Sequence, residues 1–179
     1  MARIQPLTVN EIDKKYQDLF LSFSEKFFDF KNQIPIYAHC PEGMKHIFEM
    51  TLDIQNSSTL PKRLVEIAVV AASHANKCNY CVTHHSSILK GLGLDKNTIS
   101  SIASDNPKNL TEAELLVHDY AIAVSTRAWG ISEKMFDQLR SHFNNSEIVT
   151  LTVRIALTGL FNKINQALEI EIESDLKDL

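Results

Sequence analysis

Apolar residues recur along most of the chain with the three-to-four-residue spacing of α-helices. Helices are expected over residues 10–31, 41–55, 61–76, 78–90, 111–126, 132–143 and 146–168, with a shorter one after Asp95. Only residues 169–173 alternate apolar and polar side chains, and this segment is too short to found a sheet. The fold is therefore expected to be an all-α bundle of about seven or eight helices.

Local signals mark several of the helix ends. Thr8 and Glu11 have the spacing of a capping box, in which a hydroxyl and a carboxylate each bond a backbone amide. The same spacing recurs at Thr111 and Glu114. Gly91 suits the position just after a helix, because glycine adopts the left-handed conformation at little cost.

The helix expected over residues 61–76 is apolar around most of its surface, which is typical of a central helix. Its apolar residues are Leu64, Ile67, Ala68, Val70, Ala71 and Ala72. Glu66 lies among them. A carboxylate in such surroundings requires a partner or a shifted pKa, so Glu66 is a candidate functional residue.

Four phenylalanines form a stripe along one face of the first long helix. They are Phe20, Phe23, Phe27 and Phe30, at positions i, i+3, i+7 and i+10. Such a stripe forms core or contacts another subunit, and we favour core.

The composition narrows the class of protein. The chain has 179 residues, with 18 Lys and Arg against 22 Asp and Glu, a formal charge of −4. This length predicts a single domain over residues 1–179, with residues 1–33 as an N-terminal helical arm. A mildly acidic chain is not expected to bind nucleic acid, because such binding depends on basic side chains that contact the phosphates. The N-terminus lacks the apolar region of a signal peptide, and no stretch is long enough to span a membrane, so a cytoplasmic protein is expected.

Two of the three cysteines are arranged for chemistry. Cys78 and Cys81 form a C-x-x-C pair, and His85 follows four residues later. On a helix these three positions share one face, and Cys78 would lie in the first turn, where the helix dipole favours a thiolate. His85 is one turn from Cys81 and can take its proton. Glu66 lies on the preceding helix, which must double back, so Glu66 can reach the imidazole or a thiol.

This is the chemistry of a dithiol peroxidase or a disulfide reductase. One thiolate attacks the O–O bond of a hydroperoxide and becomes a sulfenic acid. The neighbouring thiol then condenses with it to a disulfide, which an external reductant reopens.

The spacing from Glu66 through Cys78-x-x-Cys81 to His85 resembles the signature of the alkylhydroperoxidase D-like group of the carboxymuconolactone decarboxylase superfamily. The resemblance covers about residues 34–172, and Asn162 and Asn165 resemble the asparagines in the last helix of many peroxidase-related members.

The resemblance implies the all-helical fold of that group and assembly as a homotrimer or hexamer. It implies peroxidase activity, with Cys81 as the peroxidatic and Cys78 as the resolving thiol, and with Glu66 and His85 as a proton relay. The expected partners are a peroxide and an external lipoamide- or thioredoxin-like dithiol. Neither a cofactor nor a metal is expected.

The sequence departs from the family pattern at Tyr80, where the best-studied members have a second histidine. A phenol has a pKa near 10 and is a poor base near neutrality. His84 is adjacent to His85 but points about 100° away on a helix, so the missing role is not transferred to it.

Other readings of the cysteines remain open. The pair can be inert core, or it can bind zinc with His85 and Glu66, although no second set of ligands is suitably spaced. Cys40 has no partner spacing and is expected to be structural. Two further functions are a lactone-acid decarboxylase, which needs no thiols, and a redox or zinc sensor without enzymatic activity.

Overall fold

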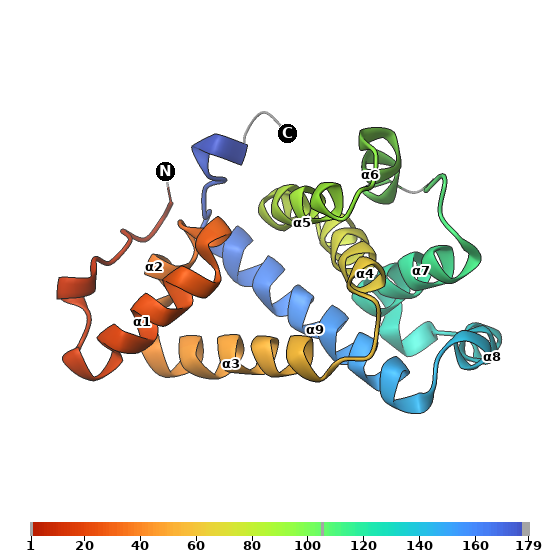
Figure 1. Ribbon diagram of the computed structural model, residues 1–179, viewed down its shortest axis with the longest axis horizontal. Coiled ribbons are helices and arrows are strands. Elements are labelled where there is room, and N and C mark those ends of the chain that lie inside the picture. The colour runs from red at the N-terminus through yellow and green to blue at the C-terminus, as the bar shows by residue number, and fades with distance from the viewer. Residues whose placement is uncertain (1, 105, 177–179) are drawn as a thin grey trace. The chain divides into compact units, whose positions relative to one another are not determined.

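The computed structural model describes residues 2–104 and 106–176, and all regular structure in them is helical (Figure 1). The α-helices are α1 (Lys14–Lys26), α2 (Ile34–Tyr37), α3 (Pro41–Ser57), α4 (Lys62–Ala75), α5 (Asn79–Gly91), α6 (Lys96–Ile102), α7 (Glu112–Arg127), α8 (Glu133–His142) and α9 (Asn145–Ala167). The all-α prediction is therefore confirmed, and most predicted helices lie within two residues of their observed bounds.

The chain divides into two compact units. One contains the residues up to Ser57 and those from Asn165 onward, and the other runs from Ser58 to Ile164. Residues 2–33, where an N-terminal arm was expected, lie within the first unit. All four candidate catalytic residues lie in the second.

In the first unit, the helix predicted over residues 10–31 is divided into three pieces. A 3₁₀ turn over Val9–Glu11 precedes α1, and another over Phe28–Phe30 follows it. The division arises because Asp13 caps α1, its carboxylate accepting a hydrogen bond from the Lys15 amide at 3.1 Å. The Glu11 carboxylate accepts from the Thr8 amide at 2.8 Å, so this predicted cap serves the 3₁₀ turn instead.

The phenylalanine stripe contributes to the core of the first unit. Phe20 and Phe23 are buried, and Phe27 is half-buried. The rings of Phe23 and Phe27 lie 5.3 and 4.9 Å from that of Phe48 on α3. At these distances aromatic rings attract one another beyond simple burial.

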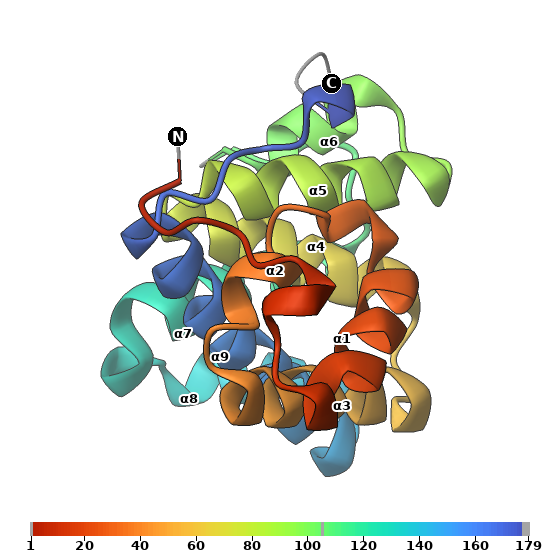
Figure 2. The ribbon, with the colours of Figure 1, turned by 90° about the vertical axis from the view of Figure 1, so that its left-hand side faces the viewer.

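In the second unit, α4 is central, and every residue from 66 to 73 is at most 2% exposed. Its apolar residues belong to two hydrophobic clusters. Ala68, Ala71 and Ala72 pack with residues of α7 and α9, whereas Ile67 and Val70 pack with residues of α5 and α6. Figure 2 shows α4 and α5 side by side. Because neighbours surround it, α4 is apolar all round, as the sequence predicted.

The turns of the second unit follow the local signals with one difference. The Glu114 carboxylate accepts from the Thr111 amide at 2.8 Å, and the Thr111 hydroxyl accepts from the Glu114 amide at 3.3 Å, which confirms the capping box. Gly91 remains inside α5, and Gly93 is the residue that takes a positive φ, of 88°. The helix runs further than predicted because the Leu92 amide still bonds the Ile88 carbonyl at 3.0 Å.

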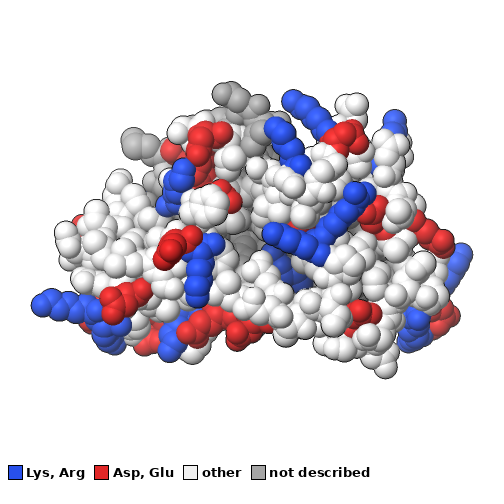
Figure 3. All heavy atoms as spheres, viewed as in Figure 1, with Lys and Arg blue, Asp and Glu red and all other residues white. Residues whose placement is uncertain are grey.

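None of the helices in residues 2–104 and 106–176 combines the length and hydropathy needed to cross a membrane. On the face shown in Figure 3, acidic and basic side chains are both spread widely.

The Glu114 carboxylate predicts how stability depends on pH. Burial favours a higher pKa for Glu114, but hydrogen bonds from Arg63 and Thr111 outweigh it, and its pKa lies below the ordinary value. The ionised form therefore stabilises the fold above about pH 4.3, the unfolded pKa, and this contribution is lost as the pH falls toward the folded pKa.

We expect Glu114→Gln to lower the free energy of unfolding at pH 7, because the amide loses the charge that Arg63 pairs with. The difference from wild type should shrink between about pH 5 and pH 3. Urea denaturation at a series of pH values measures it, and a difference that is constant with pH would contradict the prediction.

Candidate active site

Cys78 and Cys81 lie together at the start of α5. Their sulfurs are 3.2 Å apart, a thiol contact that is longer than the roughly 2.05 Å of a disulfide bond, so the pair is in the dithiol form. Cys78 is 1% exposed and Cys81 is 4% exposed. The structure thus brings the two predicted thiols together in a buried setting.

The sulfurs lie at the positive end of the helix dipole. Cys78 is the N-cap residue, with φ −93° and ψ 88°, rather than part of the first turn as predicted. The first hydrogen bond of α5 runs from the Val82 amide to the Cys78 carbonyl at 3.0 Å. The amides of residues 79–81 therefore point out of the helix end, which favours a thiolate at the pair.

Glu66 and His85 form a buried acid–imidazole pair. Glu66 Oε2 and His85 Nδ1 are 2.6 Å apart, and the two side chains are 3% and 12% exposed. An ionised carboxylate only accepts hydrogen bonds, so Nδ1–H donates, and in the neutral ring Nε2 carries the lone pair. His85 is one helical turn beyond Cys81, so the pair lies beside the thiols.

The charges around Glu66 keep its carboxylate ionised. Burial alone would raise the pKa of Glu66. The charge and the hydrogen bond of His85 have the opposite effect, with smaller contributions from Arg154 and Lys62, and its pKa lies below the ordinary value. Glu66 is therefore suited to orient the imidazole and to stabilise an imidazolium.

Tyr80 and His84 form a separate contact on the neighbouring face of α5. Their rings are stacked, with centroids 4.1 Å apart, and His84 Nδ1 lies 2.8 Å from the Tyr80 carbonyl oxygen. Both residues are buried. The two adjacent histidines thus have different partners, as their separation around the helix requires.

Arg154 of α9 is a residue of this site that the sequence reasoning missed. It is 4% exposed, and its Nη1 donates to the Thr158 hydroxyl at 3.3 Å. Burial lowers its pKa, whereas the negative charges of Glu66 and of Cys81 raise it. Arg154 is therefore close enough to both groups for their charges to act on it. A guanidinium stays protonated near neutrality even so.

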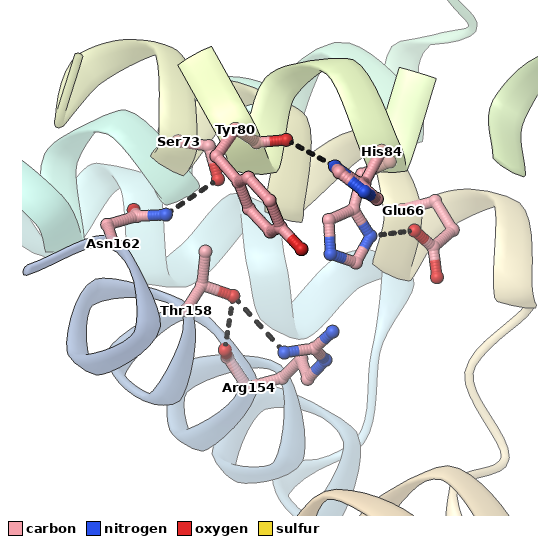
Figure 4. A network of polar contacts seen from close by, with 8 residues as sticks. Glu66, Ser73, Tyr80, His84, Arg154, Thr158 and Asn162 are labelled. Carbon is pink, nitrogen blue, oxygen red and sulfur yellow. Dashed lines mark hydrogen bonds and ion pairs between the residues drawn. The ribbon is translucent and has the colours of Figure 1, made fainter. Parts of the chain in front are cut away.

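A polar stripe on α9 holds Arg154 in place. Arg154, Thr158 and Asn162 are four residues apart and share a helix face. Asn162 Nδ2 donates to the Ser73 hydroxyl at 3.1 Å (Figure 4). Asn162 Oδ1 accepts from Asn76 Nδ2 at 2.9 Å. The spacing of positions 154, 158 and 162 shows a polar face on this helix, but it does not show which residues that face meets.

A zinc site at the cysteine pair, one of the alternatives that the sequence left open, would need a group of metal-ligating side chains. In the part of the chain that the structure describes, no three His, Cys, Asp or Glu side chains are grouped to hold a metal ion.

Solved structures share this fold. The alkylhydroperoxidase AhpD core of a peroxidase-related protein from Ralstonia eutropha JMP134 is 21% identical to this chain. It aligns over 98% of this chain and 94% of its own, with a TM-score of 0.85. The debrominase Bmp8, solved with 2,3,4-tribromopyrrole, is 19% identical, over 99% and 97% of the two chains, with a TM-score of 0.80.

Two relatives are closer in sequence. ATU0492 of Agrobacterium tumefaciens, a protein of unknown function proposed to be an AhpD antioxidant-defence protein, is 28% identical. It aligns over 76% of this chain and 95% of its own, with a TM-score of 0.71. The uncharacterized protein YdfG of Bacillus subtilis (strain 168) is 23% identical over 142 residues, which are 76% of this chain and 93% of YdfG.

Residues 41–106 match the model of the carboxymuconolactone decarboxylase family. This segment contains Glu66, Cys78, Cys81 and His85. Both the matched segment and the shared helical fold agree with the resemblance found in the sequence. The match over residues 41–106 and the helical fold shared with these structures support the similarity of this chain to the alkylhydroperoxidase D-like group of the carboxymuconolactone decarboxylase superfamily.

Proposed function

We propose that this protein is a thiol-dependent peroxidase that reduces alkyl hydroperoxides or hydrogen peroxide through Cys78 and Cys81. The observation that carries the proposal is the reduced thiol pair, with sulfurs 3.2 Å apart, one turn from the His85–Glu66 pair. A nucleophile, a base and a group that orients the base are together what activation of a thiol requires. The names of the AhpD-like relatives support a peroxidase-related role.

In the first step, the Cys81 thiolate attacks one oxygen of the hydroperoxide. An S–O bond forms and the O–O bond breaks, so the sulfur is oxidised to a sulfenic acid. The leaving oxygen takes a proton, which His85 supplies after removing it from the thiol, and an alcohol or water departs. Glu66 stabilises the imidazolium between the two proton transfers.

In the second step, the Cys78 sulfur attacks the sulfenic sulfur of Cys81. A disulfide forms and water leaves. An external lipoamide- or thioredoxin-like dithiol then reduces this disulfide by exchange and becomes a disulfide itself. Each cycle therefore consumes one peroxide and one dithiol.

Replacing Cys81 with Ser should abolish peroxide consumption above the uncatalysed rate, because a hydroxyl is far less nucleophilic than a thiolate. Cys40→Ser should leave turnover unchanged, because Cys40 is exposed and lies in the other unit. A coupled assay with dihydrolipoamide and tert-butyl hydroperoxide measures both.

Trapping the sulfenate with dimedone shows which cysteine is the peroxidatic thiol and which is the resolving thiol. The sulfenate should accumulate in Cys78→Ser, where no resolving thiol remains, and not in Cys81→Ser. Wild-type turnover no faster than that of Cys81→Ser would refute the peroxidase. Decarboxylation of a lactone acid that survives both substitutions together would favour the alternative chemistry instead.

The Glu66–His85 pair predicts a second loss of activity. Glu66→Gln keeps a hydrogen-bond acceptor but removes the charge, so turnover should fall about 100-fold, as for a lost acid–base contribution. Glu114→Gln is the matched control, because it neutralises another largely buried carboxylate of the same unit. Equal turnover in both variants across pH 5–8, with circular dichroism showing both folded, would contradict the relay.

We also propose that the chain assembles as a homotrimer or hexamer. Val149, Val153 and Leu160 lie on one face of α9 and are 61%, 39% and 39% exposed. A row of exposed apolar side chains on one helix face is a common subunit contact. Light scattering at micromolar concentration should give at least three times the chain mass, and a monomeric mass would refute the assembly.

A further inference from the structure

The guanidinium of Arg154 has donors that the fold does not use. It carries five N–H groups. In the described residues, its side-chain hydrogen bonding consists of the 3.3 Å contact of Nη1 with Thr158, and the buried Nε has no acceptor. Buried donors without acceptors are destabilising, so a fold that retains one at a reactive site has a reason outside its own packing.

The position of Arg154 is set by the packing of α9 on α4. The hydrogen bonds of Asn162 with Ser73 and Asn76 fix the two helices to each other. Arg154 lies eight residues before Asn162, and Glu66 lies seven residues before Ser73. The two helices run in the same direction, so these similar spacings bring the guanidinium to about the level of Glu66, where the charges of Glu66 and Cys81 act on it. Figure 4 shows Arg154 and Glu66 in one close-up, with Arg154 bonded to Thr158 and Glu66 bonded to an imidazole.

The charges of the site limit what the unused donors can bind. Arg154 is positive and Glu66 is negative, and Lys62 is exposed to solvent. The buried groups therefore carry no net charge when Cys81 is a thiol and His85 is neutral. Their net charge also remains zero when the thiol proton moves to His85, because a thiolate and an imidazolium balance. A ligand with a permanent negative charge would leave a buried charge uncompensated, which is costly. The donors therefore suit an uncharged ligand with oxygen acceptors.

We propose that Arg154 binds the oxygens of an uncharged hydroperoxide beside Cys81, and this inference rests on the proposed peroxidase function. As the S–O bond forms and the O–O bond breaks, negative charge develops on the leaving oxygen. The N–H groups of Arg154 stabilise that charge until His85 delivers the proton and the alcohol departs. A fixed donor aimed at developing charge is an effective form of catalysis.

The test uses single-turnover oxidation of Cys81 by cumene hydroperoxide in the Cys78→Ser background. Arg154→Met should lower the second-order rate constant about 100-fold, the effect of removing one donor to an oxyanion. Arg140→Met is the matched control, because Arg140 is exposed on α8, and it should react as the parent does.

A second reaction distinguishes an Arg154 that binds the peroxide oxygens from an Arg154 that only maintains the structure of the site. Iodoacetamide alkylates Cys81 with iodide as the leaving group, so it does not need a donor to oxygen. At pH 9.5 its rate should change less than about threefold in Arg154→Met. If alkylation and peroxide reduction fall equally, Arg154 only maintains the site and the inference is overturned.

A third variant covers the case in which Arg154→Met does not fold. Arg154→Lys keeps the charge but loses the planar array of donors. It should react more slowly with cumene hydroperoxide, by about tenfold, with unchanged alkylation. A rate equal to the parent's would overturn the inference alone. The absence of any peroxide reaction in the parent would instead refute the proposed function.

Discussion

The ionised carboxylate of Glu66 constrains the whole second unit. It lies on α4 among residues that are at most 2% exposed, where burial disfavours charge. It remains ionised because His85 of α5 donates to it at 2.6 Å and because the positive charge of Arg154 on α9 lies nearby. One buried charge thus requires three helices to pack in a single relative register. The same register puts an oriented imidazole one turn from a thiol pair, so the stability of the unit and its chemistry depend on the same contacts.

Much of the fold follows from signals that act over a few residues. The Thr111–Glu114 box could be predicted because both partners lie within one helical turn. The Glu66–His85 pair could be predicted because a short break forces α5 back against α4. The prediction of one helix over residues 10–31 was wrong because Asp13 offers a competing cap that the apolar stripe does not reveal.

Arg154 could not be predicted by such reasoning. Its surroundings on α9 repeat apolar residues, and the groups whose charges act on it lie more than 70 residues earlier in the sequence. Asn162 helps to fix which face of α9 meets α4, and its partners Ser73 and Asn76 lie 89 and 86 residues earlier in the sequence. Contacts of this kind are set by tertiary packing. The spacing of apolar residues along one helix does not reveal which helix packs against it.

The N-cap position of Cys78 has a mechanical consequence. Its backbone lies outside the helical conformation, whereas Cys81 is within the rigid first turn. Bringing sulfurs from 3.2 Å to bonding distance is a movement of about 1 Å, which rotation of the Cys78 side chain and small backbone changes before the helix can absorb. The bond from the Val82 amide to the Cys78 carbonyl can persist throughout. A disulfide between Cys78 and Cys81 would therefore require little movement of the helix or of the core behind it.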